Sequence, residues 1–181
     1  MNTEAIREFT LWAREKLSEE VRALLLQVYG LQEDGTALPQ DPPALERSGE
    51  ARRTRERLET LLADEREAGI GPKEAVAKLV KETAFTHLNR LAALKLLEGR
   101  RLIRGTLTGY TESNGFKMYL AEHEEDYRLY GAGWEPRDDV GEGPRDQAYR
   151  HYLLWQYGRL AQEVRVLFDP DNLASRLFPR P

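Results

Sequence analysis

The chain contains no cysteine among its 181 residues. This absence excludes disulfide bonds, thiolate nucleophiles and thiolate metal ligands together, and it leaves the redox compartment undetermined. The sequence also lacks any run of about 20 uncharged apolar residues, the length that a membrane-spanning helix needs. Charged residues follow the first methionine at once, with Glu4, Arg7 and Glu8, so the N-terminus is unlike a signal peptide. We therefore expect a soluble, cytoplasmic protein with no membrane partner.

An excess of positive charge is missing as well. Lysine and arginine number 27 against 31 aspartates and glutamates, which gives a formal net charge of −4. The chain as a whole lacks the basic character of a nucleic-acid binder, so any such role must depend on a local patch. Hydrophobic residues make up 40% and charged residues 32%, a balance typical of a soluble helical protein. The length predicts a single domain that spans residues 1–181.

The motifs of common catalytic sites are also absent. The sequence has no Gly-x-Ser-x-Gly elbow, no phosphate-binding loop and no Gly-x-Gly-x-x-Gly after a strand. None of the three histidines, His87, His123 and His151, has a second ligand at metal-binding spacing. We expect His87, which falls in a mostly apolar helix, to be buried and hydrogen-bonded. No catalytic, cofactor-binding or metal-ligating residue is predicted.

The most prominent feature that is present is the stretch from Pro72 to Arg104. Pro72 suits the first position of a helix and Gly99 suits the residue just past its end. The residues between them, 73–98, would form about 39 Å of helix at about 1.5 Å per residue. Their apolar side chains form a stripe so wide that we expect this helix to be buried on most sides. The sequence therefore predicts a long central helix around which the other elements pack.

Four further segments show helical periodicity. They run from Thr3 to about Gly30, from 50 to 68, from about 115 to 130, and from 144 to about 168, and the last carries many aromatic residues that suggest packing on the central helix. Together with residues 73–98 they predict an all-α fold of about five helices.

Three other segments are predicted to connect these helices or to extend beyond them. Residues 31–49 are rich in proline and read as an exposed loop. Within 105–121 a short strand with a hairpin at Asn114-Gly115 competes with a helix capped by Asn114, and we favour the helix. Trp134 is expected to pin the loop that follows to the body of the protein. Residues 169–181 form a tail.

Basic residues cluster at the end of the central helix. Arg100, Arg101 and Arg104 follow it closely, and Lys117 comes soon after. A helix C-terminus attracts cations, which is the simpler explanation of this cluster. The alternative is that these side chains bind phosphates, and on that hypothesis they are the candidate DNA-contacting residues.

Asn89 and Arg90 interrupt the apolar stripe of the central helix. If Asn89 is buried, its amide needs hydrogen-bond partners, so a role in packing specificity is the first interpretation. A ligand-facing role is the alternative. Both residues are candidate structural polar residues.

The central stretch 82–103, ETAFTHLNRLAALKLLEGRRLI, resembles a helix near the N-terminus of large adenine-specific DNA methyltransferases. These are the methylases of phage-defence systems of the BREX (PglX) and DISARM type, similar to type IIG restriction-modification enzymes. The matching pattern is aromatic-x-x-hydrophobic-Asn-Arg-Leu-x-Ala-Leu-Arg/Lys, and the residues that carry it are Phe85, Leu88, Asn89, Arg90, Leu91, Ala93, Leu94 and Lys95. The ending from Val164 to Pro181 is similar to the junction that precedes the methylase domain in this family.

The resemblance implies that this chain is the N-terminal helical region of a larger methyltransferase. The parent protein would transfer a methyl group from S-adenosylmethionine to the amino group of a flipped adenine. No position here matches the family's cofactor loop or its Asn-Pro-Pro-aromatic motif, so no catalytic or cofactor residue is carried over, and this chain alone is not expected to be an enzyme.

Two roles remain for such a domain. It could contact DNA, or it could dock on the catalytic domain of the same protein or on other subunits of the defence system. The net acidity favours docking or scaffolding as the main role, while an asymmetric basic face would favour DNA contact. An independent small enzyme is disfavoured by the absence of catalytic motifs.

Overall fold

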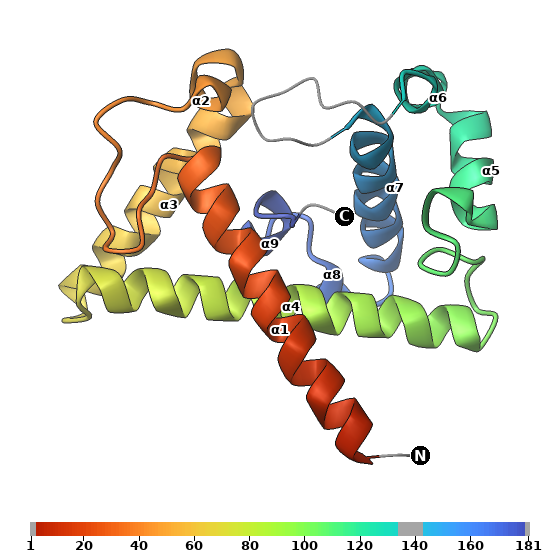
Figure 1. Cartoon of the computed structure of the whole chain (residues 1–181), viewed down its shortest axis with the longest axis horizontal. Coiled ribbons are helices and arrows are strands. Elements are labelled where there is room, and N and C mark those ends of the chain that lie inside the picture. The colour runs from red at the N-terminus through yellow and green to blue at the C-terminus, as the bar shows by residue number, and fades with distance from the viewer. Residues whose placement is uncertain (1–2, 134–142, 180–181) are drawn as a thin grey trace. The chain divides into compact units, whose positions relative to one another are not determined.

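The computed structural model describes residues 3–133 and 143–179, and their regular structure is helical (Figure 1). Within these ranges the only β-type pairing is a single bridge between Leu31 and Ala37. The predicted all-α class is confirmed, but the described residues form more and shorter helices than the five that were predicted. The elements are α1 (Thr3–Gln27), α2 (Pro43–Arg47), α3 (Gly49–Glu67), α4 (Pro72–Gly99), a 3₁₀ helix η1 (Tyr110–Glu112), α5 (Asn114–Glu122), α6 (Glu124–Gly131), α7 (Pro144–Leu160), α8 (Arg165–Phe168) and α9 (Leu173–Arg176).

The chain divides into two compact units. The first comprises Met1–Leu88 with Arg176–Pro179, and the second comprises Asn89–Ser175 with Arg180–Pro181. The predicted central helix exists as α4, one residue longer at each end than expected, and it contributes residues to both units. A single domain over 1–181 and the packing of the other helices around α4 both remain predictions.

In the first unit, the segment 31–49 differs from the exposed loop that was predicted. It contains the short helix α2, and the side chains of Leu31 and Leu45 are 4% and 3% exposed. Pro43 stands in the first turn of α2, where its missing N–H removes no hydrogen bond. The Arg52 side chain of α3 donates to the Leu45 carbonyl at 2.6 Å. The two buried leucines are too far apart to form a periodic apolar pattern, so the sequence did not predict their burial. The Arg52 side chain of the next helix holds this segment in place.

Residues Arg176–Pro179 pack within the first unit. The Tyr29 hydroxyl donates to the Arg176 carbonyl at 3.1 Å, and His87 Nε2 lies 3.0 Å from the Leu177 carbonyl oxygen. The His87 ring also meets Phe178 edge to face, with ring centroids 5.2 Å apart. His87 is 1% exposed, so the predicted buried, hydrogen-bonded histidine is confirmed. The role of 169–181 as a junction to a further domain stays a prediction.

In the second unit, the helix predicted over 115–130 is two helices. The chain breaks at His123, where φ is −127° and ψ is 86°, and α6 follows α5 in a new direction. Of the two alternatives for 105–121, the helix is confirmed and the hairpin is not. The residue that caps this helix, α5, is Ser113 and not Asn114. The Ser113 hydroxyl accepts the Phe116 N–H at 3.4 Å, as a helix N-cap does.

The helix predicted to run from 144 to 168 stops at Leu160. After a turn, α8 carries Phe168 back toward α7, and the rings of Tyr157 and Phe168 have centroids 5.3 Å apart. In one continuous helix these two residues would lie about 16 Å apart along the axis. Burial of Phe168 against Tyr157 therefore requires the interruption.

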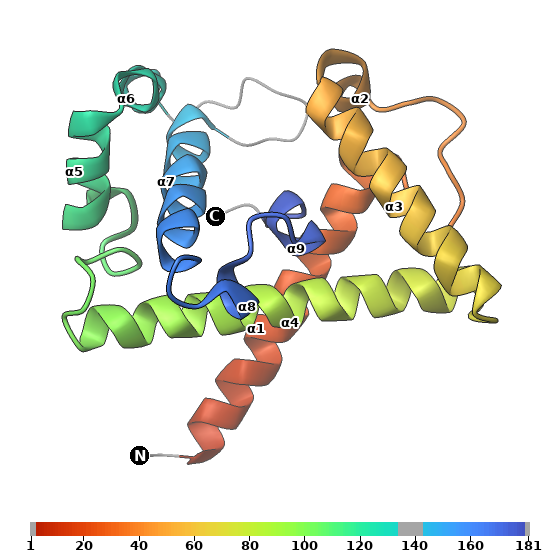
Figure 2. The same ribbon diagram turned by 180° about the vertical axis from the view of Figure 1, so that it is seen from behind.

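The aromatic side chains of α7 pack mainly on α5. Phe116 of α5 lies 5.4 Å from Tyr149 and 5.5 Å from Tyr152, measured between ring centroids. The two helices lie side by side in both views (Figures 1 and 2). One α7 aromatic residue, Tyr157, does contact the central helix, because its ring faces the Arg90 guanidinium of α4 at 5.3 Å. Trp134, which was expected to pin a loop, lies outside the described residues.

Candidate nucleic-acid interface

The candidate site begins with Glu98, near the C-terminal end of α4. One of its carboxylate oxygens accepts the backbone N–H groups of Thr106 and Leu107, each at 2.8 Å, and that of Thr108 at 3.2 Å. The other oxygen accepts the Thr108 hydroxyl and Lys95 Nζ, the latter at 3.1 Å. A loop with several unpaired N–H groups would otherwise need water to satisfy them. Glu98 thus folds the chain that follows α4 back onto the helix end.

These hydrogen bonds set the ionisation of Glu98. Burial by itself would raise the pKa of the carboxyl group. Hydrogen bonds from the Thr108 hydroxyl, from the N–H groups of Thr106 and Thr108, and from Lys95 outweigh burial and lower the pKa to about 2. Glu98 is therefore ionised at neutral pH, and its charge is used within the fold.

The same loop is fixed to α5 and α7 at Gly115. Its N–H donates to the Gly105 carbonyl at 2.8 Å. A Cβ atom at this position would lie 2.2 Å from the Tyr152 hydroxyl and 2.7 Å from the Gly105 oxygen, so no other residue fits without a shift. The Tyr149 hydroxyl donates to the Thr106 carbonyl at 2.8 Å, and Tyr152 is hydrogen-bonded to the Thr106 hydroxyl at 2.9 Å. The loop is therefore held in place along its first half.

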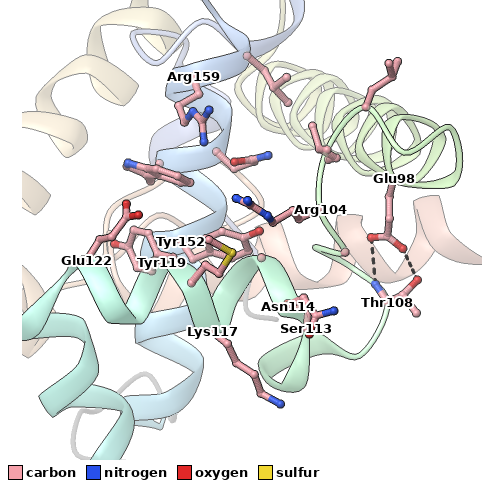
Figure 3. Close-up of a pocket in the computed structure, with 18 of the residues that line it drawn as sticks. Glu98, Arg104, Thr108, Ser113, Asn114, Lys117, Tyr119, Glu122, Tyr152 and Arg159 are labelled. Carbon is pink, nitrogen blue, oxygen red and sulfur yellow. Dashed lines mark hydrogen bonds between the residues drawn. The ribbon is translucent and has the colours of Figure 1, made fainter.

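A groove of about 1510 Å³ lies between this loop, α5 and the C-terminal half of α7 (Figure 3). Three of the four residues predicted to contact DNA line it: Arg101, Arg104 and Lys117. Arg100 is exposed but does not line the groove. The loop held by Glu98 and Gly115 therefore brings the cluster at the end of α4 together with the start of α5.

The basic side chains of this groove are not equivalent. Lys117 forms an ion pair with Glu112, with 2.8 Å between Nζ and the carboxylate, and it points away from the space into which Arg104 and Arg159 extend (Figure 3). In the described part of the chain, Arg101, Arg104 and Arg159 form no ion pair. An arginine without a carboxylate partner keeps its full charge and its fork of donors for a ligand.

Most residues that line the groove were not predicted from the sequence, and among them are Trp155, Gln156 and Arg159 of α7. The Arg159 guanidinium lies 4.8 Å from the centroid of the Trp155 ring. A four-residue spacing places these two side chains on the same face of a helix, so the Trp-x-x-x-Arg pattern was the available signal. No sequence pattern indicated that this face of α7 meets the loop after α4.

The two candidate structural polar residues behave differently. Arg90 is fully buried, and its guanidinium donates to the Leu167 carbonyl at 2.8 Å, to the Ser175 hydroxyl at 2.9 Å and to the Asp169 carbonyl at 3.3 Å. Burial lowers the pKa of Arg90 from its ordinary value. Asn89 is half-buried, and its amide makes no hydrogen bond to a described residue. Arg90 therefore provides the polar contacts of this part of α4.

Comparison with known proteins identifies no family for this chain. The chain matches no known protein family, no curated protein and no solved structure. Among the helices of the described residues, none is long and apolar enough to cross a membrane. Within residues 3–133 and 143–179, no three His, Cys, Asp or Glu side chains are grouped so that they could hold a metal ion.

Proposed function

We propose that this chain is the N-terminal helical domain of an adenine-specific DNA methyltransferase of a phage-defence or restriction-modification system. The match of Phe85, Asn89 and Arg90 to the helix of those enzymes supports this family. In this proposal the chain is cytoplasmic and non-catalytic by itself, and the catalytic domain of the same protein holds S-adenosylmethionine and methylates a flipped adenine. The chain contributes a contact to the DNA backbone.

One observation carries the DNA contact: Arg101 and Arg104 line the same groove as Arg159, which comes from another element. Phosphate groups are bound most strongly by guanidinium groups that have no carboxylate partner. Arg159 adds a third such group from α7. Four carboxylates also line the groove and match its four cations in number, so only the side formed by the arginines can be basic.

Acidic residues restrict where phosphates can lie. Glu98 also lines the groove, but its oxygens are occupied by the loop, and Glu112 is paired with Lys117. Glu122 and Glu163 line the groove as well, and no ion pair within the described residues offsets them. We therefore expect phosphates to bind on the arginine side, with a modest affinity that depends strongly on salt.

The test is binding of a short DNA duplex over a series of salt concentrations from about 50 to 200 mM. If Arg104 contacts a phosphate, Arg104→Ala weakens binding and reduces the slope of log affinity against log salt by about 1. Arg101→Ala has the same expected effect. Arg100→Ala is the matched control, because it removes the same charge from the same loop but from a side chain outside the groove.

Two results would contradict the DNA contact. One is the absence of binding at about 50 mM salt, where contacts to phosphates are strong. The other is an equal loss of affinity in Arg100→Ala and Arg104→Ala, which would indicate a diffuse attraction to net charge without a defined groove.

A docking or scaffolding role has its own supporting observation, at the start of α1. Ile6, Phe9 and Trp12 follow one another at three-residue spacing and share one side of the helix. Phe9 and Trp12 are 61% and 58% exposed, and their ring centroids are 5.8 Å apart. Contiguous exposed apolar residues mark protein interaction sites. In this second proposal the first partner is the catalytic methyltransferase domain, and other defence-system subunits are further partners.

The docking role is tested by co-elution of this chain with the separately produced catalytic domain in size-exclusion chromatography. We expect a double variant with Phe9→Ser and Trp12→Ser to lose co-elution. Phe85→Ser, which removes an exposed ring from α4, is the control. Co-elution that the double variant leaves intact, or that does not occur with the natural sequence, would rule out this surface.

A further inference from the structure

The groove contains side chains that are not needed to bind the backbone of DNA. Trp155 lines it and is half-buried, and Tyr119 lies beside it with ring centroids 5.2 Å apart. Gln156, the next residue on α7, also lines the groove and is 7% exposed. Its amide makes no hydrogen bond within the described part of the chain. The amide atoms of Gln156 are not among the fully buried polar atoms that lack a partner, so they are open to water or to a ligand in the groove.

We propose that the groove binds single-stranded nucleic acid and holds one unpaired base against Trp155 and Gln156. This inference rests on the proposed function of the same groove as a nucleic-acid contact, and it specifies the form of nucleic acid. The base stacks on the Trp155 ring in place of the Arg159 guanidinium, which lies over that ring at 4.8 Å and turns from it toward a phosphate. The Gln156 amide donates to and accepts from the edge of that base, as glutamine side chains do in base recognition.

The positions of the charged groups fit this arrangement. Arg159 lies over the Trp155 ring at 4.8 Å, and it extends with Arg104 into the same space beside Tyr152 (Figure 3). A nucleotide whose base meets Trp155 therefore has two guanidinium groups within reach of its phosphates. Cations beside an aromatic stacking surface are the usual combination in proteins that bind single strands.

The shape of the site favours a single strand over a duplex. In a duplex the faces of the bases are stacked on one another, so an aromatic ring in a groove cannot reach them. The volume of about 1510 Å³ also exceeds the roughly 300–1000 Å³ of pockets that enclose a small molecule. A short segment of a polymer suits this space better than a free nucleotide.

The acidic residues supply a check on the sign of the ligand's charge. Glu122 and Glu163 line the groove without an ion pair in the described residues. If the ligand carries phosphates, removal of either negative charge strengthens binding. A basic peptide in the same groove would bind more weakly to Glu122→Gln and Glu163→Gln.

The experiment compares a fluorescein-labelled single-stranded DNA of mixed sequence with a duplex of the same length, both at low salt. We use a background with Trp12→Phe and Trp134→Phe, in which Trp155 is the sole tryptophan. We expect tighter binding of the single strand and quenching of Trp155 fluorescence when it binds. Trp155→Leu should weaken binding of the single strand about tenfold or more, because stacking of a base on an aromatic ring is lost.

Two further variants keep the test independent of folding. Trp155→Phe retains a ring, so it should restore most of the affinity that Trp155→Leu loses. Gln156→Leu removes the amide at similar volume and should weaken binding of the single strand severalfold, while it leaves binding of the duplex unchanged. Glu122→Gln should strengthen binding of the single strand.

The outcomes separate this inference from the function on which it rests. If duplex binds at least as tightly as the single strand, depends on Arg104 and leaves Trp155 fluorescence unchanged, the single-strand inference is wrong and the backbone contact stands. If neither the single strand nor the duplex binds, both the single-strand inference and the proposed DNA contact are wrong. Equal affinities of Trp155→Leu and Trp155→Phe for the single strand would also contradict the stacking of a base on Trp155.

Discussion

The hydrogen bonds around Glu98 allow a quantitative prediction about stability. Glu98→Gln keeps the shape of the side chain but removes its negative charge and replaces one acceptor oxygen with an NH₂ group. The Glu98 side chain is 10% exposed, so solvent screens these interactions little. A pKa lowered from the ordinary 4.5 to about 2 corresponds to at most about 3 kcal/mol of stability at neutral pH, and solvent at the groove surface reduces this value.

We expect the amide variant to lose about 2 kcal/mol of this free energy of unfolding at pH 7, because its remaining oxygen still accepts some of the N–H groups. The effect has a definite pH dependence. Because the pKa of Glu98 is lower in the folded than in the unfolded state, its stabilising contribution is complete above about pH 4.5 and is lost as the pH falls toward 2. The difference between the natural sequence and Glu98→Gln should therefore shrink across this range.

The assay is urea unfolding, followed by circular dichroism, at pH 7 and at several values between pH 5 and 3. Glu122→Gln is the matched control, since Glu122 is an exposed carboxylate of the same unit. A destabilisation by Glu98→Gln below about 0.5 kcal/mol, the size of an ordinary surface substitution, would refute the reasoning. A difference that is the same at pH 7 and pH 3 would refute the part that assigns it to charge.

Two further stability predictions concern positions that the fold leaves no freedom to change. Gly115→Ala should lower the free energy of unfolding by about 1–3 kcal/mol, because its methyl group would meet the Tyr152 hydroxyl and a backbone oxygen. Gly99→Ala, whose new methyl group would meet no atom within 4 Å apart from the adjacent helix backbone, should have no comparable effect in the same thermal melt. Arg90→Met should cost about 2 kcal/mol or more, because two carbonyls and the Ser175 hydroxyl lose their donor in a buried site. A urea midpoint equal to that of Arg100→Met would contradict the role of Arg90.

Local features of the sequence were enough to predict the helical class and the longest helices. Pro72 marked the start of α4, since a proline in the first turn acts through the backbone next to it. Gly99 lies at the end of α4 to within one residue of the prediction, but the residue in the left-handed region there is Arg101, with φ 60°. The helical spacing of apolar residues likewise predicted α1 and α3. The burial of His87 followed from the apolar residues around it in the same helix.

Other features escaped prediction because they depend on residues far apart in the chain. Arg90 finds its acceptors 77 to 85 residues away, and no local pattern indicates such partners. The end of α7 at Leu160 depends on the packing of Phe168 against Tyr157, and helix propensity does not predict such a contact.

The candidate site also combines residues that the sequence predicted with residues that it did not. Residue order alone shows that basic residues follow α4, and it was enough to select Arg101, Arg104 and Lys117 as candidates. That Trp155, Gln156 and Arg159 of α7 line a groove with them, and that Arg100 does not, became visible in the folded chain. A groove is defined by the distances between elements, and Glu98 and Gly115 set those distances through contacts that helix periodicity does not encode.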